Sequence, residues 1–211
     1  LLLPDSGQAF MEGLDVVKDY RQVRRITGYM AGRFSLYQDL TVAENLKFYA
    51  TVFGTSIEEN YHLIRDIYSH IEPYRNRLAG KLSGGMKQRI VIAIALACHP
   101  LLLIADEATS NLDVTIQAQI LHEAQQLCRN TGTALIWITH DLTVIAGLSD
   151  RICVMYAGRI VEAGDIDQVL DTPHHPYTHG LIGSVPSRNK RGAPLSQIPG
   201  MTPSLLNLPP G

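Results

Sequence analysis

The sequence predicts an α/β fold in which helices cover a mostly parallel sheet, and three observations support this prediction. From Tyr61 onward, helical patterns alternate with short apolar runs, which is typical of βαβ units. Residues 101–105 and 134–138 are too short for helices and rich in aliphatic side chains, as buried strands are. The chain has 211 residues, of which 45% are hydrophobic, so it is long and apolar enough to bury a core.

Capping residues mark where the predicted helices begin. Thr41 and Glu44 form a capping-box pattern that opens a helix ending near Gly54. A second helical pattern covers residues 57–72 and ends at Pro73. The remaining helical patterns of this part of the chain cover residues 84–98 and 115–129.

A hairpin and a short helix are predicted after these elements. Residues 152–156 and 159–163 are apolar-rich runs joined by a two-residue turn at 157–158, which favours a hairpin. Asp165 and Gln168 then form the capping pattern of a short helix.

Composition divides the chain near residue 171. Of the 11 prolines, eight lie in residues 172–211. We therefore predict an α/β domain over residues 1–171 and a proline-rich, helix-poor C-terminal extension over residues 172–211. Within the domain, a helical region is expected over about residues 41–98.

The charge balance gives no general reason to expect nucleic-acid binding. A formal net charge of −2 leaves no positive field of the kind that sequence-independent binding to nucleic acid needs. The longest apolar stretch covers residues 91–105, and His99 and Pro100 divide it. Neither part approaches the roughly 20 residues that span a bilayer. We expect no secretion leader, and three widely spaced cysteines favour reduced thiols in the core.

The strongest chemical signal lies in residues 82–89, which read LSGGMKQR at the start of a predicted helix. Ser83 can cap this helix, while Gly84 and Gly85 allow a phosphate to approach backbone N–H groups where the helix dipole favours negative charge. The pattern therefore predicts an anion site. For an isolated Ser-Gly-Gly sequence, a plain serine-capped loop is the alternative.

Two carboxylates follow the next predicted strand. Residues 101–107 read LLLIADE, so the strand ends at Asp106 and Glu107, at the edge where open α/β sheets bind ligands. One carboxylate can serve Mg²⁺ and the other can orient or deprotonate an attacking water, as phosphoryl transfer to water requires. Capping of the next turn is the alternative for this pair. The polar turn SNLD at residues 110–113 follows, and His140 comes just after the later apolar strand.

In this order, the four elements resemble the nucleotide-binding domain of ABC transporters, which has a P-loop NTPase-like fold. LSGGMKQ is similar to the signature motif, LLLIADE to the Walker B strand, SNLD to the D-loop and ITHD at 138–141 to the switch-histidine loop. The resemblance implies that Asp106 holds Mg²⁺, that Glu107 acts on the hydrolytic water and that His140 contacts the γ-phosphate of ATP.

The resemblance also implies a second ATPase subunit, in a homodimer or a heterodimer. Asp113 would lie across the interface between the two subunits. The residues implied to reach the nucleotide of the second subunit are Ser83, Gly84, Gly85 and Gln88.

The sequence departs from the family pattern in three places. No G-x-x-x-x-G-K-[ST] loop occurs, and residues 1–7 resemble the stretch that follows this Walker A loop and its helix, so we expect an N-terminally truncated domain. Gly32 stands where the family usually has a glutamine, and Gln38 falls at a different place in the motif. Ala108 stands where the family often has proline.

The subfamily resemblance changes along the chain. Residues 1–87 resemble ATPases of drug or ABC-2 type exporters, whereas residues from Asp113 onward resemble ATP-binding subunits of dipeptide and oligopeptide importers. The motifs at residues 174–178 and 198–203 are similar to the C-terminal extension of those importers.

This resemblance predicts an ATP-hydrolysing subunit that energises di- or oligopeptide uptake. Its partners would be transmembrane permease subunits, and it would be peripheral at the cytoplasmic face of the inner membrane. Three alternatives stay open: an export ATPase, a soluble ABC-type ATPase that acts on nucleic acid, and a non-catalytic fragment that only presents its signature face to a partner.

Overall fold

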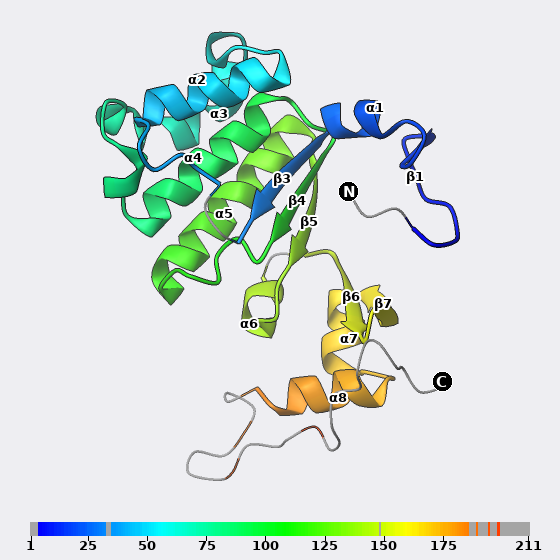
Figure 1. Cartoon of the computed structure of the whole chain (residues 1–211). Helices are drawn as coiled ribbons and strands as arrows, with labels where there is room; N and C mark the ends of the chain where they lie inside the picture. Colours follow the sequence, from blue (N-terminus) through cyan, green and yellow to red (C-terminus); the bar gives the residue numbers. More distant parts are fainter. Residues whose placement is uncertain are drawn as a thin grey trace. The chain divides into compact units, whose positions relative to one another are not determined.

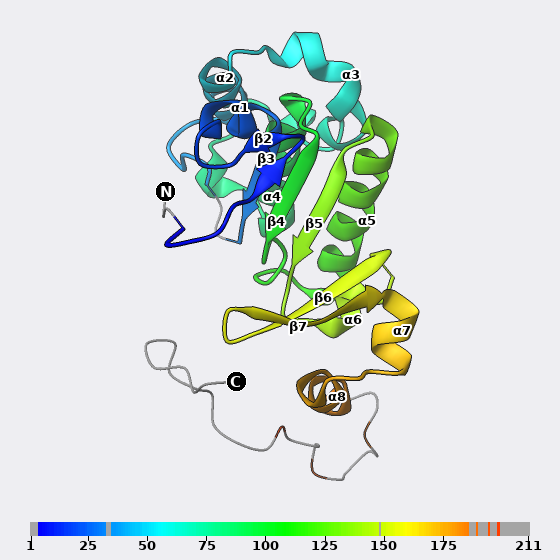
Figure 2. The same cartoon turned by 90° about the vertical axis from the view of Figure 1, so that its right-hand side faces the viewer.

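The computed structural model describes residues 4–32, 35–147 and 149–185, together with residues 189, 194 and 198. The chain forms two compact units, Leu1–His140 and Asp141–Gly211, and each has its own packing. Figure 1 shows the order of helices and strands along the chain, and Figure 2 shows the same elements after a quarter turn.

The first unit is built on a three-stranded parallel sheet, as the alternation of helices and strands predicts. In spatial order, its strands are β3 (Thr27–Ala31), β4 (Leu102–Asp106) and β5 (Ala134–Ile138). β4 is central, and its Ile104 pairs with Tyr29 of β3 and Ile136 of β5. β4 and β5 fall on the two predicted runs, whereas the sequence pattern did not predict β3.

Two helices cover one face of this sheet. α4 (Gly84–Ala97) packs along β3 and α5 (Val114–Thr131) packs along β5, and both lie on the same side of the sheet in Figure 1. Leu103 and Ala105 of β4 point into this layer and are fully buried. Both helices match the predicted ranges within two residues at each end.

The opposite face of the sheet is open. Tyr29, Ile136 and Ile138 are 57%, 48% and 47% exposed. The prediction that residues 134–138 form a buried strand is therefore wrong: Ala134, Ile136 and Ile138 are exposed, and Leu135 and Trp137 are only partly buried. Successive strand side chains point to opposite faces, so Leu135 and Trp137 pack against the core while the alternate side chains of β5 are exposed.

α2 (Val42–Phe53) and α3 (Ile57–Tyr68) both begin with a complete capping box. Thr41 and Glu44 form the predicted box of α2, and Ser56 and Glu59 form that of α3. Gly54 ends α2 in the left-handed conformation, with φ 71°.

α3 ends at Tyr68, four residues before the predicted end. Pro73 disfavours α-helical geometry in the residue before it, so the helix stops ahead of the proline. The chain continues in the 3₁₀ turns η1 (Glu72–Tyr74) and η2 (Ala79–Lys81) before α4. Before β3 lie β1 (Phe10–Met11), β2 (Leu14–Asp15) and α1 (Tyr20–Arg25).

The second unit contains the predicted hairpin. β6 (Arg151–Tyr156) pairs antiparallel with β7 (Arg159–Asp165). Ala157 and Gly158 both have positive φ, 48° and 79°, as the two-residue turns that match the twist of a hairpin require.

Helices flank this hairpin. α6 (Leu142–Ile145) precedes it and α7 (Ile166–Asp171) begins right after Asp165, as predicted, although the Asp165 side chain makes no capping bond. α8 (Pro176–Gly183) was not predicted, because the proline content of this region suggested little helix. Pro176 stands at the first helical position, where its missing N–H is not needed.

The three cysteines are free thiols, as expected. Cys128 is buried and Cys98 is partly buried, and burial raises the pKa of each thiol to about 11. Cys153 is exposed, contrary to the expectation of a core position, because it alternates along β6 with the buried Ile152 and Val154.

The Glu162 carboxylate joins α8 to the hairpin within the second unit. It accepts hydrogen bonds from the backbone N–H groups of His174 (2.7 Å) and His175 (3.1 Å). The Tyr156 and Tyr177 rings also pack against each other in a tilted arrangement, with centroids 4.4 Å apart. These hydrogen bonds, the His174 N–H first, lower the pKa of the Glu162 carboxyl.

We predict that Glu162→Gln loosens this attachment. A lowered folded-state pKa means that the stabilising contribution is present above the ordinary pKa of glutamate and is lost as pH falls through the folded-state pKa. At neutral pH, hydrogen exchange at the His174 and His175 amides should therefore be faster in Glu162→Gln than in wild type. Asp167→Asn, which changes an exposed carboxylate of α7, is the control, and equal exchange in all three proteins would contradict the assignment.

An ion pair links α4 and α5. The Arg89 Nε and Nη2 atoms donate to Glu123 Oε2 and Oε1, at 2.9 and 2.7 Å. Both side chains are mostly buried, at 12% and 15% exposure. Removing one partner would leave the other charge with little solvent to replace the lost contact.

We predict that Arg89→Met lowers the free energy of unfolding by about 3 kcal/mol, because it leaves Glu123 unpaired. The double variant Arg89→Met/Glu123→Leu should recover most of this loss, since it removes both charges together. Urea unfolding followed by circular dichroism measures both values. A double variant no more stable than the single one would show that the charge left unpaired is not the cause.

Candidate functional site

The two predicted carboxylates lie at the carboxyl end of the central strand. Asp106 is the last residue of β4 and Glu107 follows it, with a positive φ of 49° that turns the chain sharply away from the sheet. The Glu107 N–H donates to the carbonyl of Ile138 at 2.9 Å, so the turn is tied to the end of β5. In open α/β sheets, ligands bind outside this edge.

His140 meets Glu107 at this edge. His140 follows β5 by two residues, and the parallel register brings the ends of β4 and β5 together. His140 Nδ1 lies 3.0 Å from Glu107 Oε1. Both side chains are open to solvent, at 73% and 50% exposure, so a small molecule can reach them.

Asp106 has a different partner, which sequence analysis missed. The Tyr29 hydroxyl donates to Asp106 Oδ2 at 2.9 Å. This carboxylate raises the pKa of the Tyr29 hydroxyl, so the hydroxyl keeps its proton and acts as donor. The local sequence could not reveal this contact, because it depends on the pairing of β3 with β4.

Gly32 fits closely against the same turn. A Cβ at Gly32 would lie 3.0 Å from the carbonyl oxygen of Glu107 and 3.1 Å from that of Asp106. Asn111 of the SNLD turn donates from Nδ2 to the Gly32 carbonyl at 3.2 Å. The residue that replaces the glutamine of the family pattern is therefore packed against the backbone of the carboxylate turn.

The signature segment forms the beginning of α4, as predicted. Ser83 is its N-cap, and its Oγ accepts a hydrogen bond from the Met86 N–H at 3.3 Å. Ser83 is exposed and Gly84 is partly exposed, whereas Gly85 is buried. A Cβ at Gly85 would lie 2.7 Å from Cγ2 of Ile116, so this glycine allows α4 to approach α5.

Gln88 lies on the buried face of α4. Its side chain is fully buried, and neither Oε1 nor Nε2 has a hydrogen-bond partner among the described residues. Unlike Ser83, it does not reach the surface of this chain.

Asp113 caps the helix that follows the SNLD turn. Its Oδ1 accepts a hydrogen bond from the Ile116 N–H at 3.0 Å, and the residue is exposed. The neighbouring Val114 is 81% exposed, an unusual position for a large apolar side chain. Within the described residues, no hydrogen bond joins Asp113 or Ser83 to the carboxylates of β4.

The donor set of this edge fits Mg²⁺ held mainly by a nucleotide. The described residues contain no group of three or more His, Cys, Asp or Glu side chains placed to hold a metal. Mg²⁺ in phosphoryl-transfer sites takes one or two carboxylates and fills its remaining positions with phosphate and water. Asp106 meets this requirement, since Oδ1 has no hydrogen bond to any described residue.

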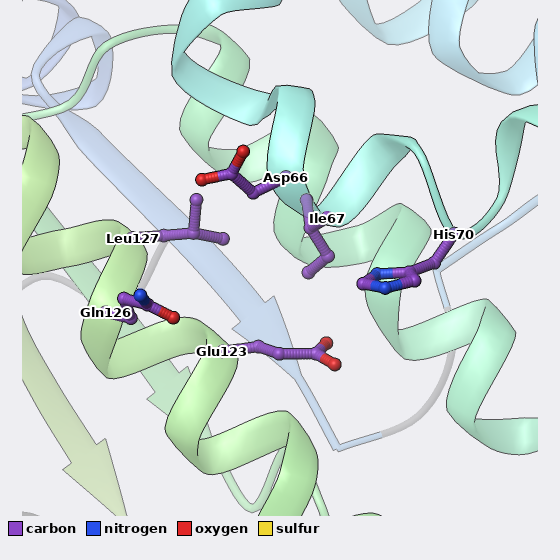
Figure 3. A pocket seen from close by; sticks show the side chains of 6 residues that line it. All are labelled: Asp66, Ile67, His70, Glu123, Gln126 and Leu127. Carbon is purple, nitrogen blue, oxygen red and sulfur yellow. The ribbon is translucent and has the colours of Figure 1, made fainter.

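A separate cavity of about 80 Å³ lies between α3 and α5 (Figure 3). It is lined by Asp66, Ile67, His70, Glu123, Gln126 and Leu127. None of these residues belongs to the predicted site, and Glu123 is already paired with Arg89.

Comparison with known proteins shows the family of this chain. Residues 1–110 match the family described as ABC transporter, and residues 161–211 match the family described as oligopeptide/dipeptide transporter, C-terminal region. The chain belongs to the ABC transporter family, in which the parallel α/β sheet is part of the ATPase domain.

Several individual relatives are named as peptide transport proteins. The chain is 47% identical over 169 residues to a peptide import ATP-binding protein of Brucella ovis, which covers 75% of this chain and 50% of the relative. It is 53% identical over 137 residues to the oligopeptide transport ATP-binding protein of Bacillus subtilis, and this match covers 64% of this chain and 38% of the relative. The dipeptide transport ATP-binding protein of the same organism is 53% identical over 131 residues, and this match covers 62% of this chain and 39% of the relative.

The chain thus spans half or less of the length of these relatives. No helix in the described part of the chain is both long and apolar enough to cross a membrane.

We predict that Gln88→Met leaves the protein as stable as wild type or raises its free energy of unfolding by about 1 kcal/mol. A buried amide without partners costs free energy that a methionine of similar shape avoids. Urea unfolding checks this, with Gln119→Met on the exposed side of α5 as the control. A clear loss of stability in Gln88→Met would show that the amide has partners in solution.

Proposed function

We propose that this chain belongs to the ATP-binding and ATP-hydrolysing subunit of an ABC transporter that energises di- or oligopeptide uptake, and that it carries the carboxylate, histidine and signature residues of the ATP site but no Walker A loop. The observation that carries the proposal is the contact between Glu107 and His140 beside Asp106, at the carboxyl edge of the parallel sheet. The match of residues 161–211 to the peptide-transporter C-terminal region, together with the names of the relatives, supports peptide import over drug export.

Each residue of the edge has a distinct role in this proposal. Bound ATP supplies the phosphoryl group that is transferred to water, and Asp106 would hold the Mg²⁺ that accompanies it. Glu107 is the carboxylate that would accept a proton from the attacking water or orient it. Because His140 uses Nδ1 toward Glu107, its Nε2 is the atom left to contact the γ-phosphate.

The signature end of α4 would serve a second nucleotide. Ser83 and Gly84 lie at the surface where the N–H groups and dipole of a 14-residue helix favour an anion. Asp113 is also exposed. These positions support an arrangement in which two ATPase subunits, identical or different, each contribute residues to both nucleotide sites. Gly85 would act by keeping α4 close to α5. A nucleotide contact from Gln88 would require its side chain to leave the core.

A membrane permease is the proposed partner. α2 exposes Phe48 (40%), Val52 (59%) and Phe53 (45%), which offer apolar surface for contact with another protein. The net charge of −2 offers no electrostatic support for nucleic acid as a partner. In this proposal, the protein is peripheral at the cytoplasmic face of the inner membrane.

We predict that Glu107→Gln lowers the rate of ATP hydrolysis by about 100-fold or more while ATP binding is kept. Glutamine preserves the size of the side chain but cannot accept the proton. Phosphate release and nucleotide binding are measured on the protein purified with its membrane complex, with and without peptide. Glu58→Gln, an exposed carboxylate of α3, is the control.

Two outcomes would contradict the proposal. Unchanged hydrolysis in Glu107→Gln would remove the assigned role of this carboxylate. Absence of both ATP binding and ATP hydrolysis in the wild-type protein would instead favour a module that only presents its signature face to a partner.

A further inference from the structure

Tyr29 and Asp106 lie on the same face of the sheet. Gly28 faces α4, since a Cβ there would meet the Ala95 carbonyl at 3.0 Å, so the next residue, Tyr29, points to the opposite, open face. On β4, Leu103 and Ala105 face the helices, and Asp106 therefore points to the open face as well.

The register of the strands brings the two side chains into reach. Tyr29 pairs with Ile104, and Asp106 stands two residues further along β4 on the same face. A tyrosine side chain is long enough to reach such a diagonal neighbour, and its hydroxyl lies 2.9 Å from Asp106 Oδ2. The contact follows from the pairing of β3 and β4, both of which are regular strands at this point.

The two carboxylates of the edge are held by different donors. Glu107 is held by His140, and Asp106 is held by Tyr29. The hydrogen bond to Oδ2 restricts rotation of the Asp106 carboxylate and leaves Oδ1, which forms no hydrogen bond to a described residue, for a ligand. The carboxylate is thereby oriented before a ligand arrives.

We propose that Tyr29 is a positioning residue, which orients Asp106 so that its second oxygen can bind the Mg²⁺ that accompanies ATP. This inference rests on the proposed function, because it assigns to Asp106 the metal-binding role described there. Tyr29 itself would touch neither the metal nor the nucleotide. Groups that orient a metal ligand in this way typically change metal affinity by 10- to 100-fold when removed.

The test removes only the hydroxyl. In Tyr29→Phe, the affinity for Mn²⁺ in the presence of a non-hydrolysable ATP analogue should fall by about tenfold, the lower end of that range because Asp106 is accessible to solvent. Free Mn²⁺ is measured by electron paramagnetic resonance. Tyr74→Phe, the same change at a tyrosine that is 42% exposed, is the matched control and should bind as wild type does.

A second readout separates positioning from a general structural effect. The Mg²⁺ concentration for half-maximal ATP hydrolysis should rise in Tyr29→Phe, while the rate at saturating Mg²⁺ stays close to wild type, because excess metal compensates for a poorly oriented ligand. A structural defect would instead lower the maximal rate. The unfolding midpoint of Tyr29→Phe should equal that of the wild type, because the hydroxyl that is removed is exposed.

Asp106→Asn distinguishes the possible failures. If Mn²⁺ binding requires Asp106 but is equal in Tyr29→Phe and wild type, the positioning role is overturned and the proposed function stands. If the wild-type protein binds no Mn²⁺ in the presence of the analogue, or if Asp106→Asn binds Mn²⁺ as tightly as the wild type, Asp106 does not hold the metal. The positioning role of Tyr29 is then overturned as well. In Asp106→Asn, adding Tyr29→Phe should cause no further loss.

Discussion

The parallel pairing of β4 with β3 and β5 is the constraint on which the candidate site depends. It places Asp106 opposite Ala31 on one side and Ile138 on the other, so segments far apart in the chain end at one edge. A shift of one residue would turn Asp106 toward the helices and Leu103 toward solvent. The burial of Leu103 and Ala105 against the helix layer opposes this shift, and the hydrophobic core thereby determines where the carboxylates point.

At this edge of the sheet, two neighbouring carboxylates are contacted by different side chains. Asp106 and Glu107 are neighbours in the chain, but the positive φ of Glu107 turns the second carboxylate out of the strand direction. Tyr29 then contacts the first and His140 the second. The side chains that orient the carboxylates come from β3 and from the segment just after β5, so the sheet positions the groups that phosphoryl transfer requires.

Local patterns predicted the features that depend on neighbouring residues. The capping box at Thr41, the serine cap at Ser83 and the hairpin turn at 157–158 are formed within a few residues of the chain, and the structure contains all of them. β3 was missed because a five-residue strand that contains a glycine has a weak local pattern. Gln88 was assigned to the site with its motif neighbours, but the motif alone does not tell which side of α4 faces the core.

The amino-acid sequence by itself determined the family, the α/β class and the positions of Asp106, Glu107 and His140, because order and spacing along the chain suffice for these. The tertiary structure decided which side chains meet: Tyr29 with Asp106, Glu107 with His140, and Glu162 with the start of α8. It also decided that Ser83 is exposed and Gln88 is buried. The reason is physical: contacts between distant residues and the orientation of a helix are set by strand register and core packing, which no local pattern contains.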